Sequence, residues 1–237
     1  EGNTIGELVQ LDRYKCIESV ILYRHPLSEE KLREIGEVLL SYNEGAKTVS
    51  ILAWACGCFL KEHLRMRGVK FPHLFLIGEA GSGKSTTLER VLLPIFSENR
   101  ILAATQVTAF TLMKESASSI IVPLPLDEFK PSKMDRMKIA TLYNHFRDSY
   151  DGHEGVRGRA DLSVVTYDLS APLIVCGEES AEETAIRERS VELLFSKKDL
   201  MHPEHKAAFH RVLQNEDMLS DFGRTLLDAA LRVTPDE

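Results

Sequence analysis

The sequence has little cysteine and no apolar run long enough to cross a bilayer. Its 4 cysteines are not spaced as zinc ligands are, so we expect buried, reduced thiols rather than a disulfide framework. The longest apolar run, residues 49–60, is well short of the roughly 20 residues of a membrane-spanning helix. No signal-peptide pattern is visible. These absences predict a cytoplasmic protein that stays out of the membrane.

The sequence also lacks an excess of positive charge. Its 29 lysines and arginines are outnumbered by 36 aspartates and glutamates, which gives a net charge of −7. No global positive field draws the chain to nucleic acid, so binding of that kind needs a local basic patch. The shares of 43% hydrophobic and 27% charged residues are ordinary for a soluble globular protein. Because the chain opens on Glu1, we expect it to be a piece of something longer.

Short apolar segments alternate with helical patterns through the middle of the chain. Apolar runs within residues 74–77, 120–128, 171–178 and 190–196 predict strands, and a helix is expected from Ser132 onward. This alternation predicts a three-layer α/β domain with a parallel sheet. Pro123 and Pro125 remove donors from the second of these strands, which we therefore expect to pair properly only near its tip.

Both flanks of this region are expected to be small. Residues 19–27 are the most strand-like part of a short lead-in, and Ser28 then caps a helix that carries two acids in its first turn. The residues after about Lys197 show a helical apolar period. We therefore expect an N-terminal extension at residues 1–47, a core at residues 48–197 and a small C-terminal helical lid at residues 198–237.

A glycine-rich loop, "GEAGSGKST", follows the first predicted strand of the core. It fits the Walker A pattern at every defined position, and a helical pattern follows it. Backbone N–H groups of such a loop converge on phosphate oxygens, Lys84 reaches the β- and γ-phosphates, and the Ser85 hydroxyl joins a Mg²⁺ shell. The alternative is a glycine-rich turn that matches by chance. The predicted phosphate-binding residues are Gly78, Glu79, Ala80, Gly81, Ser82, Gly83, Lys84, Ser85 and Thr86.

Two adjacent acids end the second predicted strand. Phosphoryl transfer needs a carboxylate near Mg²⁺ and a group that positions the attacking water. Asp127 is the candidate metal ligand and Glu128 the candidate catalytic base. The alternative is a solvated acid pair at the start of a loop.

The next predicted strand ends at Gly177 and Glu178, beside the tip that carries Asp127. A polar group there could sense the γ-phosphate or orient the water. Because an acid is an unusual neighbour for a phosphate, a helix cap or a surface acid is the competing interpretation of Glu178.

Two arginines lie between a short predicted helix and the last predicted strand. Arg187 and Arg189 could pair with the acids around them, or one could project into a neighbouring subunit's site as an arginine finger. We favour Arg189 for that role, because it is closer to the strand.

These residues resemble those of the AAA+ and superfamily 3 helicase group of P-loop ATPases, over about residues 48–196. More narrowly, "FPHLFLIGEAGSGKST", "LDE", "APLIVCGEES" and "AIRERS" are similar to helicase-type ATPases of bacteriophages and other mobile elements. The resemblance implies an AAA+/RecA-like core that binds ATP and Mg²⁺ and acts as a hexameric ring on single-stranded or duplex DNA. The sequence departs from the group at Glu178, where a sensor asparagine is typical. In the lid, Arg224 is the one candidate for a sensor arginine.

The candidate contact with nucleic acid is the segment "GHEGVRGRADLSVVTYDL". Its glycines break the preceding helix, and its second half has a strand pattern, so we expect a hairpin that carries Arg157 and Arg159. Such arginines would grip phosphates without reading sequence. The alternative is a surface loop whose arginines meet water and Asp161.

The sequence thus predicts an ATP-hydrolysing motor, a ring-forming DNA helicase or a helicase loader. A nucleotide-dependent assembly switch that never translocates is the second hypothesis, and the acidic net charge favours it slightly. A small-molecule kinase is the third, although no arginine-rich lid segment follows Lys84.

Overall fold

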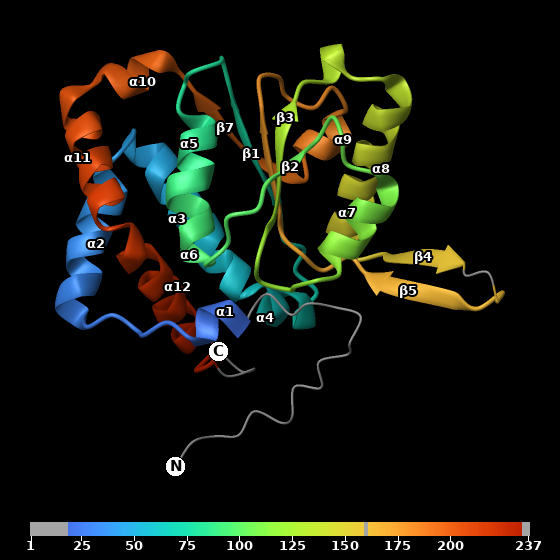
Figure 1. Cartoon of the computed structure of the whole chain (residues 1–237), viewed down its shortest axis with the longest axis horizontal. Coiled ribbons are helices and arrows are strands. Elements are labelled where there is room, and N and C mark those ends of the chain that lie inside the picture. The colour runs from blue at the N-terminus through green and yellow to red at the C-terminus, as the bar shows by residue number, and fades with distance from the viewer. Residues whose placement is uncertain (1–18, 159–160, 234–237) are drawn as a thin grey trace.

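The computed structural model describes residues 19–158 and 161–233. Five strands form a sheet in the order β2-β3-β6-β1-β7, and every paired neighbour is parallel (Figure 1). All the carboxyl ends of the strands therefore lie on one edge of the sheet. The strands are β1 (His73–Gly78), β2 (Leu102–Ala103), β3 (Leu124–Phe129), β6 (Leu173–Gly177) and β7 (Ser190–Phe195).

The central strands are apolar on both faces because helices cover both faces. Every residue of β6 is buried, and so are the first five residues of β1. The structure confirms the predicted three-layer α/β fold of a P-loop NTPase. Of the five strands, only the two-residue edge strand β2 was not predicted.

One face of the sheet is covered by the helical segment that follows the glycine-rich loop. It runs through α5 (Lys84–Thr87), a π-helical turn (Leu88–Leu92) and α6 (Leu93–Ile95). Pro94 cannot donate a backbone hydrogen bond, and an interrupted helical pattern before it is the usual way to accommodate a proline. Further helices on this side are α1 (Ser19–Leu22), α2 (Glu29–Ser41), α3 (Gly45–Phe59), α4 (Lys61–Met66), α10 (Lys197–Met201), α11 (Pro203–Gln214) and α12 (Glu216–Ala230).

The other face is covered by α7 (Ala109–Ser116), α8 (Arg136–Asp151) and α9 (Thr184–Arg187), with a 3₁₀ turn at Pro131–Lys133. Its core contains edge-to-face aromatic pairs, in which the Phe75 ring meets Phe129 and Phe146 at centroid distances of 5.9 and 5.8 Å. Helix α8 begins after the N-cap Asp135, slightly later than the predicted start.

The first and last described helices pack together. Helix α2 lies against α11, and α1 lies against α12 (Figure 1). The prediction of a strand at residues 19–27 is wrong, because α1 forms there and buries Ile21 completely. Packing of Ile21 into the helical layer overrides the local strand preference.

The pairing of β3 also differs from the prediction. Leu124, Pro125 and Leu126 pair in register with β6, and the register shifts only between Leu126 and Phe129. Pro125 is therefore accommodated in the body of the strand and Pro123 lies just before it, and it is the tip that departs from regular pairing. This irregular tip carries the two candidate acids.

A separate two-stranded antiparallel hairpin projects from the body (Figure 1). Its strands are β4 (Glu154–Gly158) and β5 (Val164–Asp168), which confirms the predicted hairpin. Among the described residues, no helix is both long and apolar enough to span a membrane.

Candidate nucleotide-binding site

The glycine-rich loop lies at the carboxyl edge of the sheet, between β1 and α5. Gly81 and Gly83 have φ angles of +74° and +89°, which side-chain-bearing residues rarely adopt. At Gly78, a Cβ atom would come within 2.3 Å of the Phe195 carbonyl oxygen. The loop therefore needs its glycines to turn tightly against the sheet.

Polar groups inside this loop lack strong partners. The Ser82 hydroxyl is buried without a hydrogen-bond partner among the described residues. Lys84 is 7% exposed, and its ammonium donates to the Glu79 carbonyl within the same loop at 3.2 Å. Buried donors in a glycine cradle at the start of a helix fit an oxyanion ligand such as a phosphate. Ser85 and Thr86 begin the helix beside them.

Helix α10 closes over the loop. Its first N–H group, that of Lys197, donates to the Glu79 carboxylate at 3.3 Å, and the Lys197 ammonium lies 3.5 Å from the same carboxylate. The Leu200 side chain covers Gly83. The loop is thereby tied to the C-terminal helices.

A cavity of about 390 Å³ adjoins the loop. It lies between the loop helix and helices α10 and α11, and burial raises the pKa of the Tyr42 phenol that lines it. Sequence reasoning missed this cavity because it interpreted residues 42–45 only as the end of a helix. The main lining residues are Tyr42, Asn43, Thr87, Met201, His205 and Phe209.

The paired acids lie on the irregular tip of β3. Glu128 has a φ of +62°, and this departure from strand geometry turns its side chain away from the direction that regular alternation gives it. Its carboxylate accepts a hydrogen bond from the Thr105 hydroxyl at 3.1 Å, while Asp127 accepts from the Glu128 N–H at 2.7 Å. Thr105, which follows β2, was not predicted. The only sign of Thr105 in the sequence was a hydroxyl-bearing residue shortly after β2, and a strand of two residues is too short to be recognised from sequence.

Glu178 follows β6 directly and forms an ion pair with Lys130, which follows β3. The pKa of Glu178 is lowered, mainly by the hydrogen bond with Lys130 and to a smaller extent by the charge of Lys84. In Cys176, burial raises the pKa of the thiol and the charge of Asp127 adds to this. The charges of Asp127, Lys84 and Glu178 therefore act on the same region of the carboxyl edge. These three predicted residues come from three separate segments of the chain.

The predicted arginines lie at the opposite edge. The His73 N–H at the start of β1 donates to the Arg189 carbonyl at 3.0 Å, so about 17 Å of strand separates Arg189 from the glycine loop. The Arg189 guanidinium donates to the Ala185 carbonyl at 2.8 Å and lies over the Tyr150 ring at 5.4 Å. Arg187 is exposed, and its side chain forms no hydrogen bond or salt bridge with another described residue.

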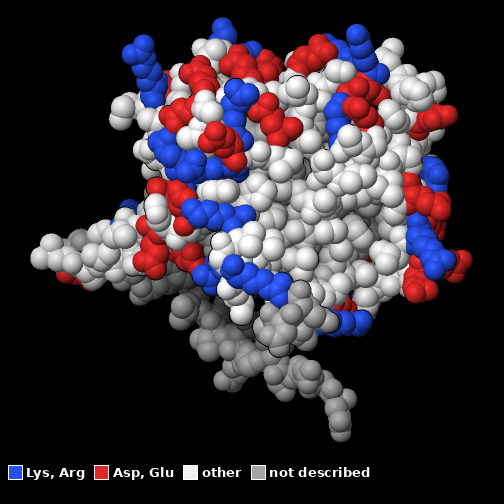
Figure 2. All heavy atoms as spheres, turned by 180° about the vertical axis from the view of Figure 1, so that it is seen from behind, with Lys and Arg blue, Asp and Glu red and all other residues white. Residues whose placement is uncertain are grey.

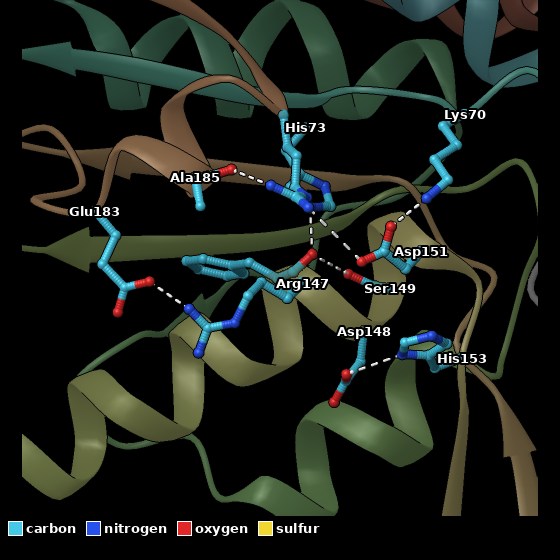
Figure 3. Close-up of polar contacts among 11 residues, drawn as sticks. Lys70, His73, Arg147, Asp148, Ser149, Asp151, His153, Glu183 and Ala185 are labelled. Atoms are coloured by element: carbon cyan, nitrogen blue, oxygen red, sulfur yellow. Dashed lines mark hydrogen bonds and ion pairs between the residues drawn. The ribbon is translucent and has the colours of Figure 1, made fainter.

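Figure 3 shows how the polar groups around this amino edge are paired. Lys70 contacts Asp151, Arg147 contacts Glu183, and His153 contacts Asp148. The buried His73 ring bonds the Phe146 carbonyl at 2.8 Å, and burial lowers its pKa to about 4.

Of the two arginines predicted on the hairpin, the structure describes Arg157. The guanidinium of Arg157 stacks on the Phe110 ring at 3.7 Å, and Arg159 lies outside the described residues. Three large apolar side chains nearby, Val156, Leu162 and Val164, are also exposed. Acidic and basic residues are intermixed on the face drawn in Figure 2.

Within the part of the chain that the structure describes, the candidate sensor arginine does not approach the glycine loop and no metal cluster is present. Arg224 donates to Asp228 at 2.8 Å and to the Leu22 carbonyl at 2.6 Å, so it is engaged with α1 rather than with the loop. In residues 19–158 and 161–233, no three His, Cys, Asp or Glu side chains gather as a metal site. The cysteines at 56, 58 and 176 are free thiols.

No protein-family model matches the sequence, and no curated protein matches it either. Among solved structures, the A form of the apo NrS-1 C-terminal region is similar with a TM-score of 0.53 at 16% identity, over 87% of this chain and 48% of that one. A second apo structure of the NrS-1 C-terminal region gives a TM-score of 0.52 at 14% identity, over 91% of this chain and 50% of that one.

A structure of JCV helicase gives a TM-score of 0.42 at 14% identity, over 90% of this chain and 61% of that one. The NrS-1 similarities show a shared fold and nothing about activity. The chain spans about half the length of those NrS-1 structures.

Proposed function

We propose that this chain is an ATP-hydrolysing motor domain that acts as a ring-forming DNA helicase in the replication of a phage or mobile element. One observation carries the proposal. The sheet brings the glycine cradle, the acids on β3 and the polar tip of β6 to one edge, and it holds Arg187 and Arg189 at the other. In this proposal residues 48–197 form the ATPase core, with residues 1–47 as extension and residues 198–237 as lid.

In the proposed site the loop N–H groups and Lys84 bind the phosphates. Ser85 and Asp127 hold Mg²⁺, whose charge stabilises the phosphates in the transition state. Glu128, oriented by Thr105, holds the attacking water and accepts its proton. The cavity beside Tyr42 receives the base and the ribose.

The site requires a second subunit in this proposal. Arg187 and Arg189 lie at the amino edge, away from the glycine loop, and in this proposal one of them contacts the phosphates of a neighbouring chain. We assign this role to Arg187 rather than Arg189, because the Arg187 side chain is exposed and unpaired among the described residues, whereas Arg189 is held by Ala185 and Tyr150.

Mixing subunits tests this arrangement. Lys84→Ala is expected to abolish nucleotide binding, whereas Lys31→Ala on the exposed face of α2 is expected to leave it unchanged. Arg187→Ala is expected to be inactive alone and to regain part of its ATPase when mixed with Lys84→Ala, which supplies an intact arginine. Mixtures without any recovery would refute the intersubunit arginine.

A nucleotide-dependent assembly switch is the second candidate function. The stacking of Arg157 on Phe110 and the apolar residues of the hairpin favour it, because they leave fewer free cations for phosphates. ATPase rates with and without single-stranded DNA distinguish the two. A DNA-stimulated rate supports the motor, and a flat rate with nucleotide-dependent particle size by light scattering supports the switch.

A further inference from the structure

A lysine and a glutamate join the tips of two neighbouring strands at the carboxyl edge. Lys130 is the first residue after β3, and Glu178 is the first residue after β6. Their side chains form an ion pair, and β3 and β6 are adjacent in the sheet. The pair therefore lies on the edge that carries the glycine loop and the paired acids.

The backbone fixes this pair in place. The Glu178 N–H donates to the Phe129 carbonyl at 3.1 Å, and a Cβ atom at Gly177 would come within 2.0 Å of the same oxygen. Nothing larger than glycine fits where the two strand tips meet. Most surface ion pairs join two flexible side chains and contribute little to stability. Here the sheet sets the positions of both Cα atoms.

The pair is coupled electrostatically to the glycine loop. Lys130 is the main cause of the lowered Glu178 pKa, and Lys84 contributes to it. A polyphosphate held by Lys84 would be repelled by the Glu178 carboxylate unless a nearby cation offset its charge. Lys130 is such a cation, and its flexible four-carbon side chain, 34% exposed, allows it to change partners.

We propose that Lys130 binds the terminal phosphate of a nucleoside triphosphate and returns to Glu178 when only a diphosphate is present. This inference rests on the proposed ATPase function and deepens it. Glu178 then acts as a competing acceptor rather than as a sensor that touches the nucleotide. The two residues together make the site discriminate triphosphate from diphosphate.

The same turn offers matched control residues. Lys133 lies three positions after Lys130, and its side chain forms no hydrogen bond or salt bridge within the described residues. Glu179 follows Glu178 but accepts hydrogen bonds from Ser132, at 3.0 Å from the N–H and 2.6 Å from the hydroxyl. Substituting either control changes the local charge equally without removing a member of the ion pair.

Equilibrium binding of a fluorescent non-hydrolysable ATP analogue and of fluorescent ADP, both with Mg²⁺, tests the inference. Lys130→Met is expected to weaken binding of the triphosphate about tenfold, the loss expected for one charge-assisted hydrogen bond, and to change diphosphate binding by less than about twofold. Glu178→Gln is expected to strengthen triphosphate binding several-fold, because it releases Lys130. Lys133→Met and Glu179→Gln are expected to change neither affinity.

The opposite signs distinguish this role from a structural one. An ion pair that merely joined the strand tips would make both substitutions shift the affinities in the same direction, and that result would overturn the inference. Equal effects of Lys130→Met on both nucleotides, or no effect on either, would also overturn it. If the wild-type protein binds neither nucleotide, it is the proposed function that fails, so the two failures are distinguishable.

Discussion

The two edges of the central sheet differ in how their polar side chains are partnered. At the amino edge, His73 bonds the Phe146 carbonyl, and Arg189 bonds the Ala185 carbonyl and lies over Tyr150, although its Nε is buried without a partner among the described residues. At the carboxyl edge, the Ser82 hydroxyl is buried without a partner among the described residues, and Lys84 bonds only its own loop. A satisfied buried group stabilises a fold, whereas an unsatisfied one costs free energy that a ligand can recover.

This contrast separates residues that hold the molecule together from those available for chemistry. Charged groups exist at both edges, so the presence of charge does not distinguish them. What distinguishes the glycine loop is that the fold leaves its buried Ser82 hydroxyl without a partner among the described residues and gives Lys84 a partner only within the loop. Substitutions at the carboxyl edge should therefore change turnover, and substitutions of partnered groups at the amino edge should change stability. Arg187, which is exposed and unpaired among the described residues, is the exception at the amino edge.

The largest expected effect is on turnover at the carboxyl edge. Glu128→Gln should lower the ATPase rate by about a hundredfold or more, because a general base is removed, while nucleotide binding persists. Asp148→Asn at the amino edge should leave the rate unchanged. Steady-state ATPase and nucleotide-binding assays on both variants test this prediction. Equal losses of ATPase rate in the two variants would contradict the proposed difference between the two edges.

The stability of the protein should depend on pH because two histidines are buried on the face of the sheet that α8 covers. Burial lowers the pKa of His73 and of His145 from 6.5 to about 4. The unfolded chain takes up these protons as the pH falls below 6.5, while the folded protein stays neutral until about pH 4. The free energy of unfolding should therefore fall over that window, by about 3 kcal/mol for each histidine.

Denaturant unfolding between pH 7 and pH 4 checks this effect. The His145 ring bonds the buried Ser116 hydroxyl at 2.8 Å, and His145→Gln keeps a hydrogen-bonding group there while removing the titration. That variant should show a flatter pH profile than the wild type. Exposed His25 provides the control, since His25→Gln should leave the profile unchanged.

Substituting the two arginines at the amino edge should have different effects, one on stability and the other on turnover. Arg189→Ala should lower the free energy of unfolding by about 1 to 2 kcal/mol, because it removes a hydrogen bond and a cation–π contact. Arg187→Ala should leave thermal unfolding unchanged and abolish turnover. Thermal melts and ATPase assays on both variants decide the assignment, and a destabilised Arg187→Ala protein would contradict it.

The smallest expected effect concerns the orientation of Glu128. Thr105→Val keeps the side-chain shape and removes the hydroxyl that bonds Glu128. Turnover should fall about three- to tenfold with no change in nucleotide affinity, a loss within the range of a single hydrogen bond. Thr108→Val, which alters the N-cap of α7, should instead lower stability and leave turnover unchanged.

The sequence by itself determined the main strands, the glycine loop and the hairpin. Each has a local cause: an apolar run between turn residues, glycines at fixed spacing, or a break in a helical pattern. The glycine-rich loop could be predicted in detail because its backbone geometry depends on residues adjacent in the chain.

Only the tertiary structure decided which polar and charged side chains have partners. Lys130 meets Glu178, Thr105 meets Glu128 and Tyr150 meets Arg189 because the sheet order and helix packing bring together residues distant in sequence. The helix at Ser19–Leu22 likewise forms where the local pattern favours a strand. Local propensity is worth at most about 1 kcal/mol per residue, and burial of one side chain such as Ile21 outweighs it.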